Sequence, residues 1–205
     1  KSSFLEVAYL LIYGKLPNRS ELEKFETNIK RRSLIHEDVT RFYESFPANA
    51  HPMGILASMI SALSTFYPKS QDPNRPIRDV DRTIHRLMAK LPNLAALAYK
   101  TSNGHPSNYP QNKLGYVDNF LYMMFALPTE EYEIDPVISS ALNKLLILHA
   151  DHEQNCSAST VRIVGSAQVN LFSAISAGVA ALWGPLHGGA NQAVIEMLEA
   201  IRNDG

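Results

Sequence analysis

Residues 51–67 read HPMGILASMISALSTFY, and in a helix they would carry apolar side chains on nearly every side. A helix at the surface of a protein keeps one polar face, whereas a helix that is apolar all round is usually buried. This stretch therefore predicts a central helix that the rest of the chain surrounds.

Helical periodicity continues on both sides of this stretch. Residues 77–91, IRDVDRTIHRLMAKL, form an amphipathic segment that we expect Pro92 to break or kink. Residues 190–205 form a last amphipathic segment, for which Asn191 is the expected N-cap. We find no stretch with the alternating pattern of a strand, so the sequence predicts an all-α fold.

The composition sets limits on the class of protein. The chain has 205 residues, of which 45% are hydrophobic and 19% charged, enough for one sizeable core. Its formal net charge of −1 argues against a general nucleic-acid binder, and no apolar run is long enough for a membrane span. The single cysteine, Cys156, excludes an internal disulfide and is expected to be a small packed residue in a reducing compartment.

A first candidate site is the segment HADHE, residues 149–153. If the helix continued through it, His149, His152 and Glu153 would share one helical face. Two imidazoles and a carboxylate can bind zinc, but no third distant ligand is identifiable, so we expect no metal. The other interpretations are a pocket for an anionic substrate and a plain helix C-terminus, where histidines interact well with the helix dipole.

A second candidate site is the segment GPLHGG, residues 184–189. Glycines on both sides of His187 allow close backbone approach to a ligand and unusual backbone angles. A histidine on such a loop can act as a hydrogen-bond donor or as an acid–base group. The alternative is a tight turn between helices whose histidine caps a neighbouring helix.

A third feature is a basic stripe along one helical face. It consists of cations spaced four residues apart: Arg78, Arg82, Arg86 and Lys90. Neighbouring aspartates offset part of this charge, so a solvated face is one interpretation. The other is a site for a phosphorylated ligand, because arginine pairs well with phosphate.

The two histidine segments, taken together and in this order, resemble one family. LHADHEQNCSAST (residues 148–160) followed by AGVAALWGPLHGGANQAVIEML (residues 177–198) strongly resembles citrate synthase, most of all the bacterial hexameric type. Other stretches fit in the same order, among them HPMGILASMISAL and NFLYMMF, so that the resemblance covers essentially the whole chain. The related 2-methylcitrate synthase, which uses propionyl-CoA, is the second interpretation, because its counterpart of HADHEQN usually reads differently.

The resemblance implies an acyltransferase that condenses acetyl-CoA with oxaloacetate to citrate and CoA, with no tightly bound cofactor. It implies that His187 is catalytic and donates a hydrogen bond to the acetyl carbonyl oxygen, on which charge develops. It further implies that His152 binds oxaloacetate with His149 in support, and that Leu186 and Gly188 contact acetyl-CoA.

The resemblance also implies a division of the chain. Residues 1–187 would belong to a large helical domain whose N-terminal part is missing, and residues 188–205 would start a small domain. The family's second catalytic histidine, its catalytic aspartate and its oxaloacetate-binding arginines have no counterpart before Gly205. We therefore expect the 205 residues alone to be inactive. An alternative from another class is a non-catalytic helical interaction domain.

Regulation, assembly and location follow from the resemblance as expectations. Hexameric members are often inhibited by NADH, and the residues that resemble their NADH site are Arg31, Arg32, Ser33, Tyr67, Arg86 and Lys90. Cations for phosphate and an aromatic ring for stacking are suitable residue types for a dinucleotide. The expected partners are the two substrates and further copies of the same chain, in the bacterial cytoplasm, without nucleic acid or membrane.

Overall fold

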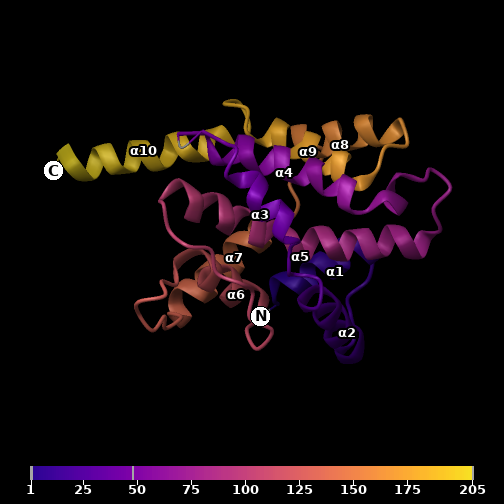
Figure 1. Cartoon of the computed structure of the whole chain (residues 1–205), viewed down its shortest axis with the longest axis horizontal. Helices are drawn as coiled ribbons and strands as arrows, with labels where there is room; N and C mark the ends of the chain where they lie inside the picture. Colours follow the sequence, from indigo (N-terminus) through magenta and orange to yellow (C-terminus); the bar gives the residue numbers. More distant parts are fainter. Residues whose placement is uncertain (1, 48, 205) are drawn as a thin grey trace. The chain divides into compact units, whose positions relative to one another are not determined.

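The computed structural model describes residues 2–47 and 49–204, and within these residues it contains helices and no strand. The all-α prediction is therefore confirmed. In chain order (Figure 1) the helices are α1 (Phe4–Tyr13), α2 (Arg19–Lys30), α3 (Glu37–Tyr43), α4 (Pro52–Phe66), the 3₁₀ helix η1 (Pro68–Gln71), α5 (Ile77–Ser102), α6 (Tyr116–Phe125), α7 (Pro136–Leu148), α8 (Cys156–Ser166), α9 (Leu171–Leu182) and α10 (Gly189–Asp204). No helix among the described residues combines the length and apolar character needed to cross a membrane.

The helices fall into two compact units. The first comprises Lys1–Pro52 and Pro76–His152, and the second comprises Met53–Arg75 and Glu153–Gly205. The second unit thus holds nearly all of α4 together with η1, α8, α9 and α10. The expected boundary between residues 187 and 188 lies inside the second unit, just before α10, and as a domain boundary it stays a prediction.

Side-chain caps fix where several helices begin. Ser3 accepts a hydrogen bond from the backbone N–H of Glu6 while the Glu6 carboxylate accepts one from the N–H of Ser3, which forms a capping box on α1. Asn18 and Glu21 do the same on α2. Asp135 caps α7 as its position before Pro136 suggests. The expected cap Asn191 is wrong, because α10 already begins at Gly189.

Helix α5 passes through Pro92 without a break, contrary to one of the two outcomes expected from the sequence. Proline has no backbone N–H, so the carbonyl of Met88, four residues earlier, lacks its usual helical donor. The hydroxyl of Tyr116 donates a hydrogen bond of 2.9 Å to this carbonyl instead. Burial raises the pKa of Tyr116 and keeps the phenol in its donating form.

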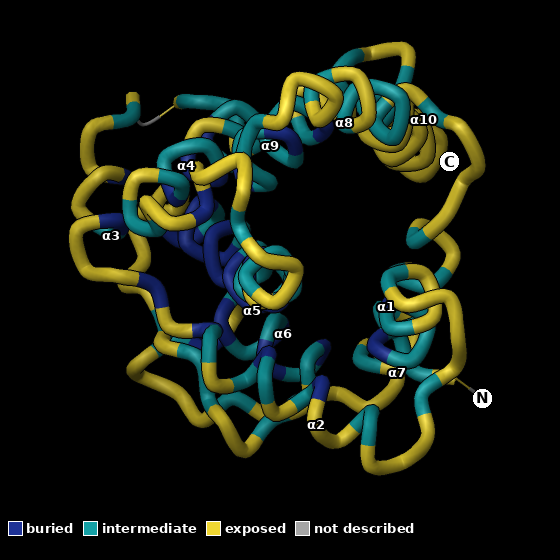
Figure 2. The backbone as a smooth tube through the Cα atoms, turned by 90° about the vertical axis from the view of Figure 1, so that its right-hand side faces the viewer, coloured by how far each residue is buried: buried dark blue, intermediate teal, exposed yellow. Residues whose placement is uncertain are grey.

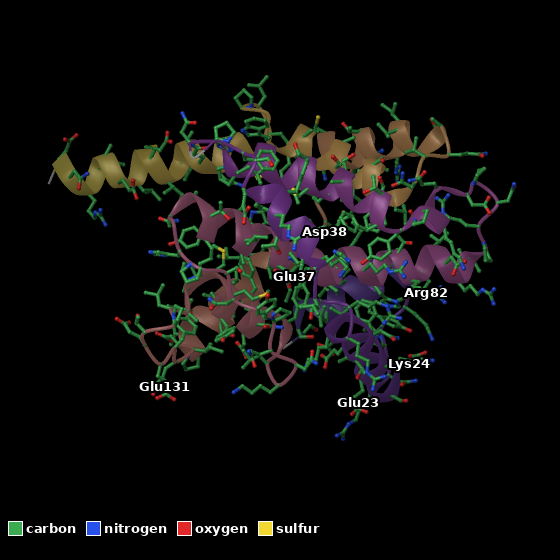
Figure 3. The ribbon with its side chains drawn as sticks, viewed as in Figure 1. Glu23, Lys24, Glu37, Asp38, Arg82 and Glu131 are labelled. Atoms are coloured by element: carbon green, nitrogen blue, oxygen red, sulfur yellow. The ribbon has the colours of Figure 1, made fainter. Side chains whose placement is uncertain are left out.

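In the first unit, α5 packs against α2, α3 and α6. Leu5, Phe25, Ile29 and Ala89 form a buried apolar cluster between α1, α2 and α5. The opposite face of α2 is polar, and Figure 3 shows Glu23 and Lys24 extending away from the helix there. The amphipathic pattern of α2 thus matches its burial.

In the second unit, α9 lies between α4 and α8 (Figure 2). A Cβ atom on Gly178 would lie only 2.6 Å from a methyl group of Val161, so only glycine permits this approach of α9 to α8. On the other side, the hydroxyl of Ser176 donates a hydrogen bond of 2.7 Å to the carbonyl of Ala57 in α4. These contacts hold α9 against its two neighbouring helices.

Candidate active site

His187 lies in a turn, residues 183–188, that joins α9 to α10. The carbonyl of Gly184 accepts hydrogen bonds from the N–H groups of His187 and Gly189, at 3.0 and 3.1 Å. A Cβ atom on Gly188 would lie 2.4 Å from the carbonyl oxygen of Leu182, so no other residue fits there without movement. The glycines of GPLHGG therefore allow a compact turn, as the sequence suggested.

The imidazole of His187 is held by Ser157, the second residue of α8. Nε2 of His187 lies 2.9 Å from the Ser157 hydroxyl oxygen, which lies 2.9 Å from the carbonyl oxygen of Gly178. Asn155 caps α8 by accepting a hydrogen bond from the N–H of Ala158. The same close approach of helices that requires Gly178 thus places Ser157 against His187.

The single proton of the Ser157 hydroxyl links two arrangements of the imidazole. If that proton points to Gly178, Nε2 of His187 carries its own proton and donates to Ser157. If it points to Nε2, a neutral imidazole carries its proton on Nδ1. In both arrangements Nε2 is engaged, and no described residue forms a hydrogen bond with Nδ1. Nδ1 is therefore the ring atom that can meet a ligand.

The segment HADHE does not continue a helix, so the condition for a shared helical face is not met. Helix α7 ends at Leu148, and residues 149–155 form a connection to α8. Glu153 adopts φ 53°, a left-handed conformation that interrupts helical geometry. Among residues 2–47 and 49–204, no cluster of three or more histidine, cysteine, aspartate or glutamate residues could hold a metal ion.

His149 closes the end of α7. It is the C-cap residue, and its Nδ1 lies 2.8 Å from the carbonyl oxygen of Leu145. This contact matches the plain interpretation of the segment, in which a histidine interacts with the last carbonyls of a helix. His152 lies exposed in the middle of the connection and can face a ligand.

The candidate residues are divided between the units. His149 and His152 end the first unit, whereas Leu186, His187 and Gly188 belong to the second. That they share one substrate pocket stays a prediction. Leu186 is fully exposed beside His187. Cys156, expected to be packed, is exposed at the start of α8.

The residues expected to bind NADH are divided in the same way. Tyr67 lies in the second unit, stacked on Phe172 with ring centroids 5.4 Å apart, and the other five lie in the first. Ser33 is buried, and its carbonyl accepts a hydrogen bond from the Asn93 amide. Arg32 donates to the carbonyl of Asn28 at 2.7 Å, while Arg31 is exposed.

Lys90 is the buried end of the basic stripe, whose first two members, Arg78 and Arg82, are exposed. Its ammonium group donates a hydrogen bond to the carbonyl of Leu34. Burial, with a smaller effect from Arg86, lowers the pKa of Lys90 to about 8. The basic stripe is therefore exposed at Arg78 and Arg82 and buried at Lys90. The interpretation of the whole stripe as a solvated face is wrong at its Lys90 end.

Sequence reasoning missed Ser157, Asn155 and Gly178 as parts of the site. A serine or glycine inside a small-residue helix carries no distinctive spacing, so its role emerges only from the packing of α8 on α9. The cap at Asn155 had a usable signal, because asparagine before a helical segment is a common N-cap.

Together, the all-helical fold and the histidine turn define a class of helical protein with an anchored imidazole at a helix junction. The family model described as citrate synthase, C-terminal domain, matches residues 1–205. Citrate synthase 1 of Mycobacterium tuberculosis is 56% identical over 205 residues, which are 100% of this chain and 47% of that protein. Citrate synthase of Corynebacterium glutamicum is 54% identical, over 99% of this chain and 46% of that protein.

Solved structures agree with these sequence matches. Citrate synthase from Pyrobaculum aerophilum superposes with a TM-score of 0.89 at 34% identity, over 98% of this chain and 50% of that one. The ternary complex of Thermoplasma acidophilum citrate synthase with carboxymethyl coenzyme A and oxaloacetate gives 0.87 at 26% identity, over the same shares. The chain belongs to the citrate synthase family, and it spans about half the length of the curated relatives it matches.

Proposed function

We propose that the protein containing this chain condenses acetyl-CoA with oxaloacetate to give citrate and CoA. The observation that carries this proposal is the His187 imidazole, anchored by Ser157 through Nε2 and left with Nδ1 for a ligand. Membership of the citrate synthase family over all 205 residues supports it. The relatives are named as citrate synthases, so the propionyl-CoA alternative is not favoured.

In this reaction a base removes a proton from the methyl group of acetyl-CoA, and negative charge moves onto the thioester oxygen. His187 stabilises that oxygen by donating a hydrogen bond from Nδ1, more strongly in the transition state than in the ground state. For a neutral imidazole this requires Ser157 to turn its proton from Gly178 to Nε2. The methyl carbon then bonds to the keto carbon of oxaloacetate, and water hydrolyses the citryl thioester. The resemblance assigns the base to an aspartate beyond residue 205.

The remaining site residues have supporting roles in this proposal. His152 donates a hydrogen bond to oxaloacetate from its exposed position, and His149 holds the end of α7 from which that loop starts. Leu186 and Gly188 flank His187 and contact acetyl-CoA, Leu186 through its fully exposed side chain.

The test uses the protein expressed from its full reading frame. We expect CoA release that depends on both oxaloacetate and acetyl-CoA, with a lower kcat/KM for propionyl-CoA. His187→Gln should lower kcat by at least about a hundredfold, because the glutamine amide can take the place of Nε2 but puts no donor at the position of Nδ1, where the charge develops. No CoA release by the wild-type protein, or full activity of His187→Gln, would contradict the proposal. Residues 1–205 alone should show no turnover.

We further propose that NADH inhibits the full protein through the cations of the first unit. Arg31 is exposed, Arg32 is half-buried beside it, and both follow α2 directly. Titration of the full protein with NADH should lower activity, and Arg31→Ala should raise the concentration needed, whereas Lys24→Ala should leave it unchanged. Absence of inhibition at any NADH concentration would refute this proposal.

We also propose that the full protein is a homo-oligomer in the bacterial cytoplasm. The apolar residues that α10 exposes support it, since such a face needs a partner surface. Light scattering on the purified full protein should give a multiple of the chain mass, and a monomer would contradict it.

A further inference from the structure

Trp183 stands where α9 ends and the His187 turn begins. It is the C-cap residue of α9, and its backbone N–H donates hydrogen bonds to the carbonyls of Val179 and Ala181. It is 44% exposed, so more than half of this large side chain is covered. The covered part includes ring atoms that lie against Gly54 in α4, within the same unit.

The contact with Gly54 is close. A Cβ atom built on Gly54 would lie 3.2 Å from two carbon atoms of the Trp183 ring, tighter than an ordinary van der Waals contact. The absent side chain of Gly54 therefore allows the indole to rest directly on the α4 backbone. Ile55 and Met59, which follow on α4, are 4% and 0% exposed, so this is a firmly packed support.

The turn needs such a support because its internal hydrogen bonds do not fix its orientation relative to the other helices. The bonds to the Gly184 carbonyl close the turn on itself but make no link to another helix. Pro185 and Leu186 are exposed. Two contacts tie residues 183–188 to helices other than α9 and α10: the His187 imidazole lies on Ser157 and the Trp183 ring lies on Gly54.

We propose that Trp183 is a positioning residue, which fixes the His187 turn on α4 so that the imidazole keeps its bond to Ser157. This inference rests on the proposed role of His187. A single hydrogen bond to an imidazole leaves rotation about that bond free, and the second attachment at Trp183 removes it. Small displacements of a catalytic group are costly, since about 1 Å can lower a rate by about a hundredfold.

The experiment compares variants of the full protein by kinetics and by ¹⁵N NMR of selectively labelled histidine. Trp183→Ala should lower kcat by about tenfold or more, leave KM for oxaloacetate nearly unchanged, and shift the ring nitrogen signals of His187. Trp183→Phe should recover most of kcat. His187→Gln identifies the His187 signals.

Two further variants keep the test decisive. Gly54→Val retains the indole but puts methyl groups where its ring lies, so it should reproduce the loss of kcat even if Trp183→Ala fails to fold. Ser176→Ala removes another link between α9 and α4, and it should leave kcat and the His187 signals unchanged.

Unchanged kcat and unchanged His187 signals in Trp183→Ala and Gly54→Val would overturn the inference. So would an equal loss of kcat in Ser176→Ala, because the effect would then belong to general packing. If His187→Gln keeps full activity, the proposed function of His187 fails, while the NMR signals still report whether Trp183 orients the ring.

Discussion

Ser157 has one hydroxyl proton for two acceptors, so the direction of that proton is linked to which nitrogen of His187 carries a proton. Without the hydroxyl, neither tautomer of the imidazole is favoured by a protein partner. We expect Ser157→Ala to lower kcat by about tenfold or more, with KM for oxaloacetate nearly unchanged, because only one tautomer donates from Nδ1. Steady-state kinetics of the full protein measures this.

The matched control for Ser157→Ala is Ser166→Ala. Ser166 lies at the other end of α8, where its hydroxyl donates a hydrogen bond to the carbonyl of Ile163. This variant should have wild-type kcat. Equal effects of the two substitutions would show that the stability of α8, and not the tautomer of His187, controls the rate.

Lys90 makes the free energy of unfolding depend on pH. Its pKa is about 8 in the folded protein and about 10.5 in the unfolded chain, so the unfolded chain binds more protons between these values. The free energy of unfolding therefore rises as the pH increases through this range. Below this range both states bind the proton, so the cost of burying the ammonium group no longer depends on pH.

Substitution of Lys90 by methionine should remove this dependence. From about pH 8 to about pH 10, the unfolding free energy of the wild type should gain about 1–2 kcal/mol relative to Lys90→Met. Denaturant unfolding of both proteins at each pH measures the difference. Lys24→Met, an exposed lysine on α2, is the control, and a flat difference for Lys90→Met would refute the assignment.

At the scale of elements, α5 depends on a hydroxyl from another helix. Tyr116→Phe leaves the carbonyl of Met88 without a donor and should lower the unfolding free energy by about 1–2 kcal/mol. In a Pro92→Ala background the new backbone N–H can serve this carbonyl, so the same substitution should cost less. A double-mutant cycle measures this coupling, and additive effects would contradict it.

Because α8 packs closely on α9, alanine substitutions of two glycines in these helices should have opposite effects on stability. Gly178→Ala puts a methyl group 2.6 Å from Val161 and should destabilise the protein by about 1–3 kcal/mol. A Cβ atom on Gly165, in the same pair of helices, meets nothing within 4 Å, so Gly165→Ala should be neutral or stabilise by about 0.5–1 kcal/mol. Thermal unfolding compares them, and equal shifts would disprove the close approach.

Element boundaries show where local sequence signals sufficed. Ser3 and Asp135 cap the starts of α1 and α7, and Gly14 caps the end of α1, because each acts on backbone groups only a few residues away. Pro92 and Asn191 did not behave as local rules suggest. The Tyr116 hydroxyl replaces the bond that Pro92 removes, and the turn at residues 183–188 passes directly into α10 two residues before Asn191.

At the scale of the whole molecule, two stretches far apart in sequence build the second unit. Residues 53–75 lie with residues 153–205, although most of the first unit separates them in the chain. The apolar stretch 51–67 predicted a buried helix, and Ile55, Met59, Ile60 and Leu63 are indeed buried in α4. Its partners could not be predicted, since an apolar surface does not specify which helix covers it.

By itself, the sequence determined the helical class, some helix ends and the two histidine segments, because periodicity, caps and glycine-rich turns act over a few residues. It also carried the family resemblance that the comparisons confirm. Only the tertiary structure decided that Ser157 holds His187, that Tyr116 replaces the donor lost at Pro92, and that Trp183 rests on Gly54. These contacts join residues from different helices, and they depend on the distance between helices, which no local pattern in the sequence encodes.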